Sequence, residues 1–297
     1  VPTYLPATRY GGPIYSVHGL CKALVTRGHE VHVFTTNVDG ENNSDVPINT
    51  AVDIDGVKVW YFSSDRLRRL YYSSQMKIEL ETRIKEFDLV HLHSVFLWPT
   101  WAAARAAQAA GVPYVLSPRG MLVIDLVQRK SRWIKTAWLR LIEKKNIKHA
   151  SALHVTSDAE AQASNDFSFK FPPVFNIANG VDKPKPWSPD ELNEDVGEVV
   201  EDDDYVLYFG RLNWEKGLDR LLHAWGDVPD WQLVIAGNDE EDYLPTLVEA
   251  ATKSGVTERV TFLPRSITGA DKEALLQTAS LLVLPSYSEN FGNVVPE

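Results

Sequence analysis

Hydrophobic residues along this chain follow two alternating spacings, which predict strands and helices in turn. Short apolar runs, bounded by glycine, proline or polar residues, predict buried strands. In the first half of the chain we expect such strands at 31–35, 87–94, 114–117, 152–156 and 175–178. In the second half we expect them at 205–209, 232–236, 260–263 and 281–285.

Apolar residues spaced three and four apart predict helices between these strands. The first helix opens at Gly11-Gly12-Pro13 and ends at Gly28, because proline suits a first helical turn and glycine suits a helix end. The remaining helices are expected at 99–110, 129–149, 218–225, 243–254 and 270–278. This alternation predicts an α/β protein with parallel, doubly wound sheets.

A segment rich in proline and acidic residues separates the two alternating regions. It covers residues 184–204 and lacks apolar periodicity, as expected of a linker. We therefore predict two facing Rossmann-like domains, at 1–183 and 205–297, that bind a ligand at the carboxyl ends of their strands. Both look incomplete, because no strand precedes the first glycine-rich loop and no helix closes the second sheet.

Charge divides between the same two regions. Residues 1–183 hold 22 Lys and Arg against 17 Asp and Glu, whereas residues 184–297 hold 8 against 23. The asymmetry suggests two units with different partners. The overall net charge of −10 argues against binding to nucleic acid.

The cysteine content and the length of the apolar runs indicate the compartment in which the protein is expected. The single cysteine, Cys21, excludes an intramolecular disulfide, and its place on an apolar helical face predicts a packing role. No apolar run approaches the ~20 residues of a membrane span, and no signal peptide is recognisable. These features favour a cytoplasmic protein in a reducing compartment.

The predicted helix at 129–149 is basic on one side and apolar on the other. Trp133, Ile134 and Trp138 stand on its apolar side. Its cations are Arg129, Lys130, Arg132, Lys135, Arg140, Lys144, Lys145 and Lys148. Such a helix suits peripheral contact with an anionic membrane. The alternative is a packed helix with one solvated face.

Two cations follow the first strand of the second half. Arg211 lies two residues past that strand, and Lys216 precedes Gly217, where a helix is expected to open. A diphosphate is bound well by a bidentate guanidinium, a compact ammonium and helix N-terminal amides together. The alternative is a solvated Arg and Lys, with an ion pair to Glu215.

Two glutamates with seven residues between them end the chain. Glu289 follows the last predicted strand, and Glu297 lies in a helix expected to begin at Asn293. Carboxylates accept hydrogen bonds from sugar hydroxyls. The amides expected to point at an anion are those of Asn290, Phe291 and Gly292. A capping acid and a surface acid are the alternative, but together with the cation pair the pattern predicts a site for a nucleotide-activated sugar.

Residues of the first half are candidates for the other wall of the cleft. Gly12 would let the backbone approach a phosphate or sugar closely; its loop is not G-x-G-x-x-G, so a nicotinamide dehydrogenase is not supported. His93 lies nearer its strand end than His91, and Arg119 follows the next strand. A tight turn, core histidines and a structural ion pair are the alternatives, and no third metal ligand is near the histidines in sequence.

These residues stand in segments that resemble the retaining GT-B glycosyltransferases of family 4, or glycosyl transferases group 1. The resemblance covers essentially the whole chain, and it is most specific in the last two of its five segments. The segments are GGPIYSVHGLCKALVTRGHEVHVFTTN, VLSPRGML, NGVD, FGRLNWEKGLDRLL and PSYSENFGNVVPE.

The resemblance implies a donor site in the C-terminal domain. Arg211 and Lys216 would hold the diphosphate of a UDP- or GDP-sugar, and Glu289 would contact the transferred sugar, aided by the amides of residues 290–292. Glu297 would contact the ribose, and Gly12 would line the donor site from the N-terminal domain.

The resemblance also implies a saccharide or lipid-linked acceptor near His93 and Arg119. Many members of the family carry histidine where this chain has Arg119. The SPRGML segment is similar to a bacterial subgroup that makes exopolysaccharide or lipopolysaccharide, which favours a role in cell-surface polysaccharide synthesis.

The implied chemistry is a front-face displacement that retains anomeric configuration and needs no cofactor or metal. The leaving phosphate would take the proton of the acceptor hydroxyl, and Arg211 and Lys216 would stabilise the leaving diphosphate. The alternatives are a GT-B sugar-nucleotide epimerase, which would turn over without an acceptor, and a catalytically inactive binding fragment.

Overall fold

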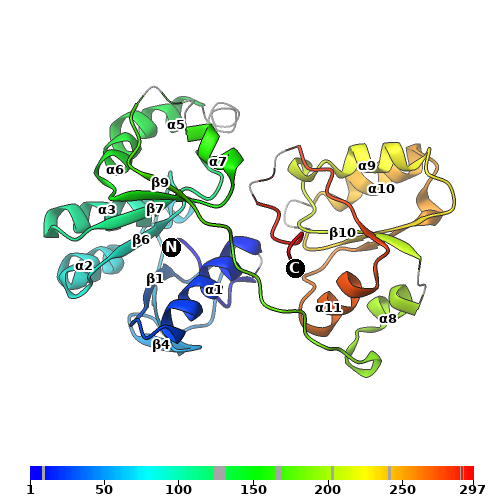
Figure 1. Ribbon diagram of the computed structural model, residues 1–297, viewed down its shortest axis with the longest axis horizontal. Helices are drawn as coiled ribbons and strands as arrows, with labels where there is room; N and C mark the ends of the chain where they lie inside the picture. The colour runs from blue at the N-terminus through cyan, green and yellow to red at the C-terminus, as the bar shows by residue number, and fades with distance from the viewer. Residues whose placement is uncertain are drawn as a thin grey trace. The chain divides into compact units, whose positions relative to one another are not determined.

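The structure is a computed structural model. It describes residues 1–8, 11–122, 132–164, 167, 169–201, 204–239, 242–287, 289 and 291–297. The chain forms two compact units, unit 1 at Val1–Gly180 and unit 2 at Val181–Glu297 (Figure 1). Both are built from parallel strands with intervening helices, as predicted.

The first sheet of unit 1 has the strand order β1-β5-β4. β1 (His32–Thr36) pairs with β5 (Val57–Phe62) in parallel, and β4 (Ala51–Ile54) pairs with β5 in antiparallel fashion. β4 and β5 were not predicted. The turn between them has positive φ at both Asp55 and Gly56, the geometry of a type I′ two-residue hairpin.

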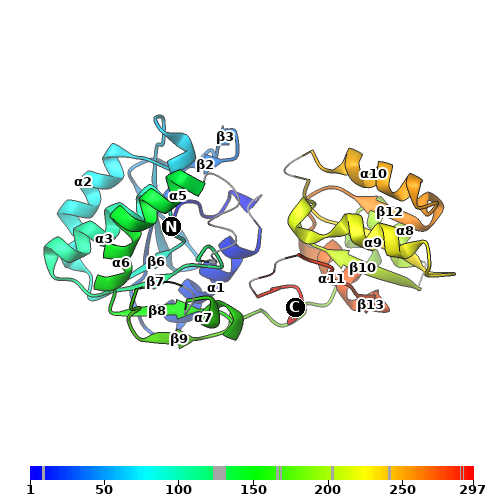
Figure 2. The ribbon, with the colours of Figure 1, turned by 90° about the horizontal axis from the view of Figure 1, so that it is seen from above.

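The second sheet of unit 1 is wholly parallel, in the order β6-β7-β8-β9. These strands are β6 (Val90–His93), β7 (Tyr114–Ser117), β8 (Ala152–Val155) and β9 (Val174–Asn176). Figure 2 shows α2 (Ser74–Arg83), α3 (Trp98–Ala110) and α6 (Lys144–His149) beside this sheet. Met76, Ala104 and Leu116 share the buried core between them. Because the four strands are parallel, their carboxyl ends lie at the same edge of the sheet.

Shorter elements complete unit 1. The helix α1 (Gly12–Thr26) packs Val17 and Cys21 into a core with β1 and β5. Cys21 is buried, in agreement with its predicted packing role. The other short elements are β2 (Val38–Asp39), β3 (Asn42–Asn43), α7 (Asp158–Ala163) and single 3-10 turns at Arg68–Leu70 and Ile84–Glu86.

The predicted basic helix at 129–149 is divided into three parts where the structure describes it. α5 (Arg132–Trp138) and α6 flank a π-helical turn at Leu139–Glu143. The Glu143 carboxylate is fully buried, and it accepts hydrogen bonds from Phe96 N at 2.8 Å and Trp138 Nε1 at 2.9 Å. The wider π turn accompanies this buried carboxylate, which apolar spacing alone did not predict. Residues 129–131 lie outside the described residues.

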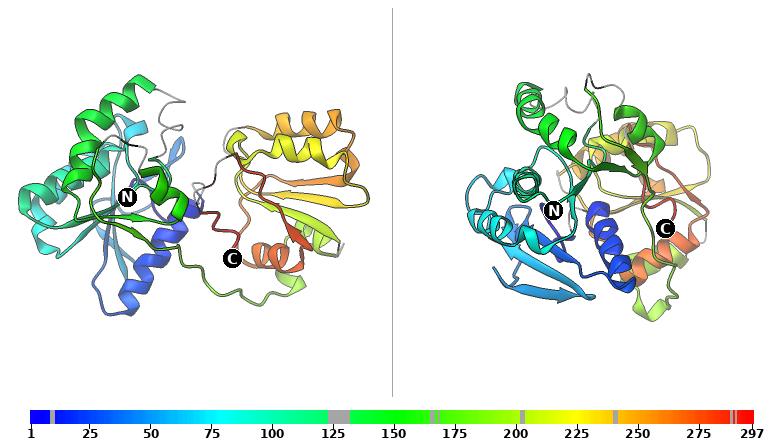
Figure 3. Two further views of the ribbon diagram at one scale, coloured as in Figure 1. Left: turned by 45° about the horizontal axis from the view of Figure 1, so that its top comes forward. Right: turned by 60° about the vertical axis from the view of Figure 1, so that its left-hand side comes forward.

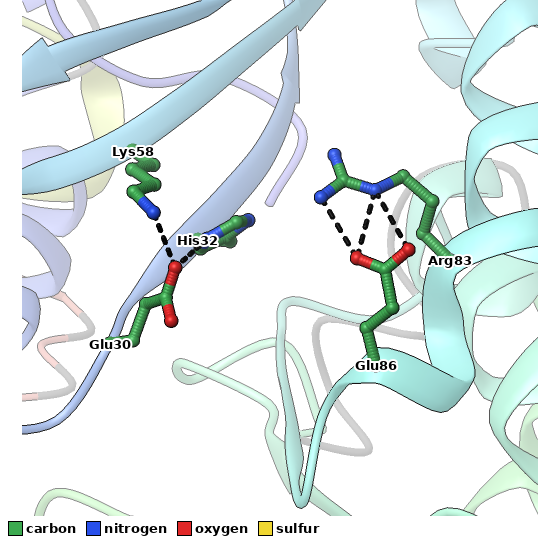
Figure 4. A network of polar contacts seen from close by, with 5 residues as sticks. All are labelled: Glu30, His32, Lys58, Arg83 and Glu86. Atoms are coloured by element: carbon green, nitrogen blue, oxygen red, sulfur yellow. Dashed lines mark hydrogen bonds and ion pairs between the residues drawn. The ribbon is translucent and has the colours of Figure 1, made fainter.

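Charged side chains gather at the amino ends of β1 and β5. Figure 4 shows Lys58 bonded to Glu30, whose Oε1 also lies 3.0 Å from His32 Nε2. The hydrogen bond from Lys58 lowers the Glu30 pKa to about 2, with a smaller contribution from His32. Arg83 binds Glu86 nearby, with Nη2 2.9 Å from Oε2. These charges are paired with one another at the end of the strands opposite to the carboxyl edge.

Unit 2 is a four-stranded parallel sheet with helices on both faces. Its order is β12-β11-β10-β13. The strands are β10 (Tyr205–Phe209), β11 (Gln232–Ala236), β12 (Val260–Leu263) and β13 (Leu281–Leu282). Figure 3 shows α9 (Leu218–Trp225) and α10 (Leu244–Lys253) on one face, with α8 (Glu194–Glu201) and α11 (Gly269–Thr278) on the other. The predicted strands 205–209, 232–236 and 260–263 are confirmed.

The segment expected to be a linker contains the helix α8. Val196 and Val199 of this helix are buried against the sheet, in a core with Leu207 and Leu275. The many acids of the segment obscured this short apolar stripe, and the structure differs from the expectation at this point. A 3-10 turn at Pro189–Glu191 precedes the helix.

Candidate functional site

The turn after β10 carries Arg211 and is held to the loop after β11. Gly210 N donates to Ala236 O at 3.0 Å, and Leu212 N donates to Asn238 O at 2.9 Å. The Tyr208 hydroxyl donates to Arg211 O at 2.8 Å. Burial, reinforced by the charge of Glu289, raises the Tyr208 pKa, so this hydroxyl stays protonated and keeps donating.

Close approach of the two backbones explains the glycines in these loops. A Cβ on Gly237 would stand 2.0 Å from Gly210 O, a separation that no side chain tolerates. Gly237 also has a φ of 143°, which L-residues rarely adopt. The loops after β10 and β11 are therefore packed closely against each other next to Arg211.

Lys216 and Glu289 form an ion pair at the same edge of unit 2. Lys216 Nζ lies 2.6 Å from Glu289 Oε2, and Ser286 Oγ lies 3.2 Å from the same oxygen. The two charged residues are 73 positions apart in the chain. Parallel strands end at one edge, and this topology brings the predicted cation and the predicted carboxylate together.

The Lys216 turn also contacts the loop after β13 through its backbone. Lys216 ends a 3-10 turn at Trp214–Lys216, and Gly217, with a φ of 65°, is the N-cap residue of α9. A Cβ on Gly217 would stand 2.4 Å from Pro285 O. Tyr287 N donates to Glu215 O at 2.9 Å. These contacts fix the ion pair from both sides.

Arg220 and Tyr287 belong to this arrangement and were not predicted. The Arg220 guanidinium stands 3.9 Å from the centroid of the Tyr287 ring and donates to Pro285 O. The Tyr287 hydroxyl donates to Asp219 Oδ2 at 3.2 Å. Both residues lie in the two segments singled out from the sequence, so their position in those segments was the available signal. They hold the Glu289 loop against α9.

The last residues of the chain differ from the helix expected at 293–297. Residues 293–296 form turns, with Val295 N donating to Gly292 O at 2.9 Å. Glu297 Oε2 lies 2.7 Å from Lys272 Nζ of α11, a partner that was not predicted. Phe291 and Gly292 follow Glu289 closely, and Asn290 lies outside the described residues.

His93 and Arg119 contact each other at the carboxyl edge of unit 1. Arg119 Nε and Nη2 each lie 3.3 Å from His93 Nδ1, and Arg119 Nη1 donates to Asn179 Oδ1 at 2.6 Å. Burial lowers the pKa of His93 well below its usual range, with further contributions from His91 and Arg119. His93 is therefore neutral, and its Nδ1 accepts from the guanidinium.

A chain of uncharged groups lies beside His93. His91 Nε2 is 2.8 Å from Ser117 Oγ, which is 2.9 Å from His154 Nδ1. His154 Nε2 then lies 3.0 Å from Ile177 O. Burial lowers the His91 pKa to about 3, with further contributions from His154 and Arg119. His91 is half-buried and hydrogen-bonded, in agreement with the alternative interpretation of a hydrogen-bonded histidine.

The remaining predicted features occupy separate places in unit 1. Gly12 is the first residue of α1, after Gly11 with a φ of 68°. On the basic segment, Trp133, Ile134 and Leu141 are exposed.

No helix within the described ranges combines the length and apolar character needed to cross a bilayer. In the same ranges no group of three or more His, Cys, Asp or Glu side chains is arranged to hold a metal.

Two family models match the chain. One, described as a glycosyl transferase 4-like domain, matches residues 11–180, and the other, described as glycosyl transferases group 1, matches residues 190–297. A glycosyltransferase of Methanocaldococcus jannaschii is 26% identical over 98% of this chain and 75% of its own length. A D-inositol 3-phosphate glycosyltransferase of Mycolicibacterium smegmatis is 28% identical over 92% of this chain and 65% of its own length.

Solved structures resemble this chain over most of its length. Sucrose-phosphate synthase from Thermosynechococcus elongatus has a TM-score of 0.70 at 19% identity, covering 96% of this chain and 72% of that one. Anabaena HepE in complex with UDP and glucose has a TM-score of 0.68 at 20% identity, covering 96% and 74%. The resemblance inferred from the sequence is confirmed: the chain belongs to the glycosyl transferases group 1 and has the GT-B fold.

Proposed function

We propose that this protein transfers a hexose from a nucleotide-diphosphate sugar to a saccharide or lipid-linked acceptor, with retention of configuration, in cell-surface polysaccharide synthesis. The observation that carries the proposal is the Lys216–Glu289 pair beside the Arg211 turn, at the carboxyl edge of unit 2. Solved relatives of the same fold hold UDP and UDP-glucose, which supports a nucleotide-sugar donor.

Each group of this edge has a role that suits its chemistry. Arg211 and Lys216 would bind the diphosphate, since a guanidinium and an ammonium complement its charge. Glu289 would accept hydrogen bonds from hydroxyls of the transferred sugar, and Glu297 from those of the ribose. In the free protein Lys216 and Glu289 neutralise each other, so donor binding would redistribute this pair between phosphate and sugar.

The proposed reaction is a displacement on the front face of the sugar. The acceptor oxygen forms a bond to the anomeric carbon while the bond from that carbon to the diphosphate breaks. The proton of the acceptor hydroxyl passes to the departing phosphate oxygen. Arg211 and Lys216 would stabilise the charge that builds up on the diphosphate, and the scheme routes no step through a metal or cofactor.

We further propose that the basic segment of unit 1 rests on an anionic membrane at the cytoplasmic face. Its exposed Trp133, Ile134 and Leu141 lie among Lys135, Arg140 and three further lysines, the combination that favours an interfacial helix. Co-sedimentation with anionic and with zwitterionic vesicles tests this. Binding to the anionic vesicles alone, lost in Trp133→Ser with Ile134→Ser, supports it, and equal binding to both vesicle types contradicts it.

A thermal-shift panel tests the donor site. Purified protein is titrated with UDP-, GDP- and ADP-sugars, the free nucleotides and NAD. A ligand at ~100 times its Kd should add about 2.7 kcal/mol of stability. We expect a shift with one nucleotide family that is lost in Arg211→Ala. A shift that survives in Arg211→Ala would remove Arg211 from the site.

A second assay separates transfer from the alternative chemistry. The nucleotide that stabilises the protein identifies the donor, and the donor is then incubated with the protein in the absence of any acceptor. Formation of an epimeric nucleotide-sugar would identify an epimerase. Stable donor, consumed only when a saccharide or lipid-linked acceptor is added, supports the transferase.

A further inference from the structure

Arg119 is a half-buried cation whose hydrogen-bond partners are all neutral. Within the described part of the chain, its side chain bonds to His93 Nδ1 and to Asn179 Oδ1. The nearby carboxylate of Glu160 is used elsewhere, since it accepts from Gly120 N at 2.6 Å and Thr156 N at 2.9 Å. The charge of the guanidinium therefore has no bonded counter-charge among these residues.

The guanidinium keeps donors available for a ligand. It has five N–H groups in one plane, and three are accounted for by Nε and Nη2 on His93 and by Nη1 on Asn179. One N–H on each terminal nitrogen is left among the described contacts. Two N–H groups on adjacent nitrogens match the spacing of two oxygens of a carboxylate or phosphate.

The histidines near Arg119 add no charge of their own to the site. His93 is neutral, as are His91 and His154 on the adjacent strands, because burial lowers the pKa of each. Burial also lowers the Arg119 pKa itself, which reflects the cost of holding this cation away from water. An anion bound to the guanidinium would relieve that cost.

The backbone of Arg119 is held in a strained conformation. Its φ is 56°, in the left-handed region that costs a bulky residue free energy. The hydrogen bond from Gly120 N to Glu160 Oε1 and the bond from Arg119 to Asn179 hold the turn there. The strained turn lies directly after β7, at the carboxyl edge where parallel sheets bind ligands.

We propose that Arg119, supported by His93 and Asn179, binds an oxyanion carried by a sugar substrate, either a carboxylate or a phosphate. This rests on the proposed transferase function and narrows its substrate class to acidic or phosphorylated sugars. Arg119 contacts the oxyanion through its two remaining N–H groups. His93 and Asn179 are positioning residues, because they orient the guanidinium without contacting the anion.

Isothermal titration of the full chain in the presence of UDP tests the proposal. The ligands of the first arm are glucose, glucuronate and glucose 6-phosphate. The second arm compares UDP-glucuronate with UDP-glucose, and so distinguishes an oxyanion on the donor from one on a free sugar. We expect an acidic ligand in one arm to bind at least about tenfold tighter than its neutral counterpart, since charge-assisted hydrogen bonds are the strong ones.

Two variants remove the anion site in different ways. Arg119→Gln removes the cation. Asn179→Asp keeps the guanidinium but gives it an internal carboxylate 2.6 Å from Nη1, and its near-identical shape preserves the fold. Both should reduce the preference for the acidic ligand to less than about threefold, whereas Arg105→Gln, at an exposed arginine of α3, should leave it unchanged.

The outcomes separate this inference from the proposed function. No preference for acidic ligands in either arm overturns the inference, and so does a preference that survives in both variants. If UDP still binds in those cases, the donor site stands and only the anion site falls. If no nucleotide of the thermal-shift panel binds either, the proposed function falls with it.

Discussion

The carboxyl edges of the two units carry their positive charge in opposite ways. In unit 2, Lys216 is neutralised by Glu289 at 2.6 Å. In unit 1, the described partners of Arg119 are a neutral imidazole and an amide. Similar parallel sheets therefore present a cation paired with a carboxylate at one edge and, among the described contacts, a cation bonded only to neutral groups at the other.

The largest expected effect comes from breaking the pair in unit 2. Lys216→Ala removes a cation from the proposed diphosphate site and leaves Glu289 without its partner. We expect transfer to slow by about 10²–10³-fold, the usual cost of losing one electrostatic stabiliser of a transition state. Steady-state kinetics measures this, with Lys253→Ala as control, because Lys253 pairs with Glu249 on α10. A Lys216→Ala rate within a few-fold of wild type would exclude the proposed role.

The next effect concerns the turn that holds this pair. Gly217→Ala forces a side chain into a positive-φ position, 2.4 Å from Pro285 O. We expect a loss on the order of 2–3 kcal/mol in the free energy of unfolding, from backbone strain and overpacking together. Urea denaturation measures it. Gly197→Ala in α8, where nothing stands within 4 Å of the new Cβ, should instead stabilise by about 0.5–1 kcal/mol.

We expect acid to lower the free energy of unfolding of unit 1 through the protonation equilibrium of His91. Its pKa is about 3 in the fold against an ordinary value of 6.5, so the unfolded chain takes up the proton first as pH falls. Stability is complete above pH 6.5 and declines from there toward pH 3, by about 2 kcal/mol at pH 5 for this one group. Urea unfolding across this pH range should show a smaller decline in His91→Asn, and an unchanged one in a variant of the exposed His29.

The smallest effect is expected at the paired charges of Figure 4. Glu30→Gln removes the acceptor shared by Lys58 and His32, but the pair is exposed and screened by solvent. We expect unchanged transfer and a stability change confined to low salt. Because the Glu30 pKa is lowered from 4.5 to about 2, its contribution is present above pH 4.5 and lost as pH falls through 2. Unfolding curves at low and high salt check this.

The features that could be predicted from the sequence are those that depend on local composition or on a general rule of topology. Continuous apolar runs predicted β7, β10, β11 and β12 residue for residue, since a buried parallel strand shows its burial directly in composition. The topological rule that parallel strands end at one edge was enough to group Lys216 with Glu289. The β4–β5 hairpin had a local signal in Asp55-Gly56, but its antiparallel pairing departs from the alternation of strands and helices that predicted the rest.

Other features depend on contacts that no local pattern contains. The π-helical turn accompanies a carboxylate, Glu143, bound by the distant Phe96 amide. The stacking of Arg220 on Tyr287 and the pairing of Glu297 with Lys272 join positions brought close only by the finished sheet. The neutral surroundings of Arg119 arise in the same way, because burial sets the protonation state of the neighbouring histidines.

The backbone contacts around Arg211 would have a thermodynamic consequence for the proposed binding of a donor. Its carbonyl accepts from Tyr208, the next residue donates to Asn238, and the preceding glycine fits against Gly237. The main chain here therefore has little conformational entropy left to lose if a ligand binds. Binding energy at this position can appear as affinity instead of being consumed in arranging the loop.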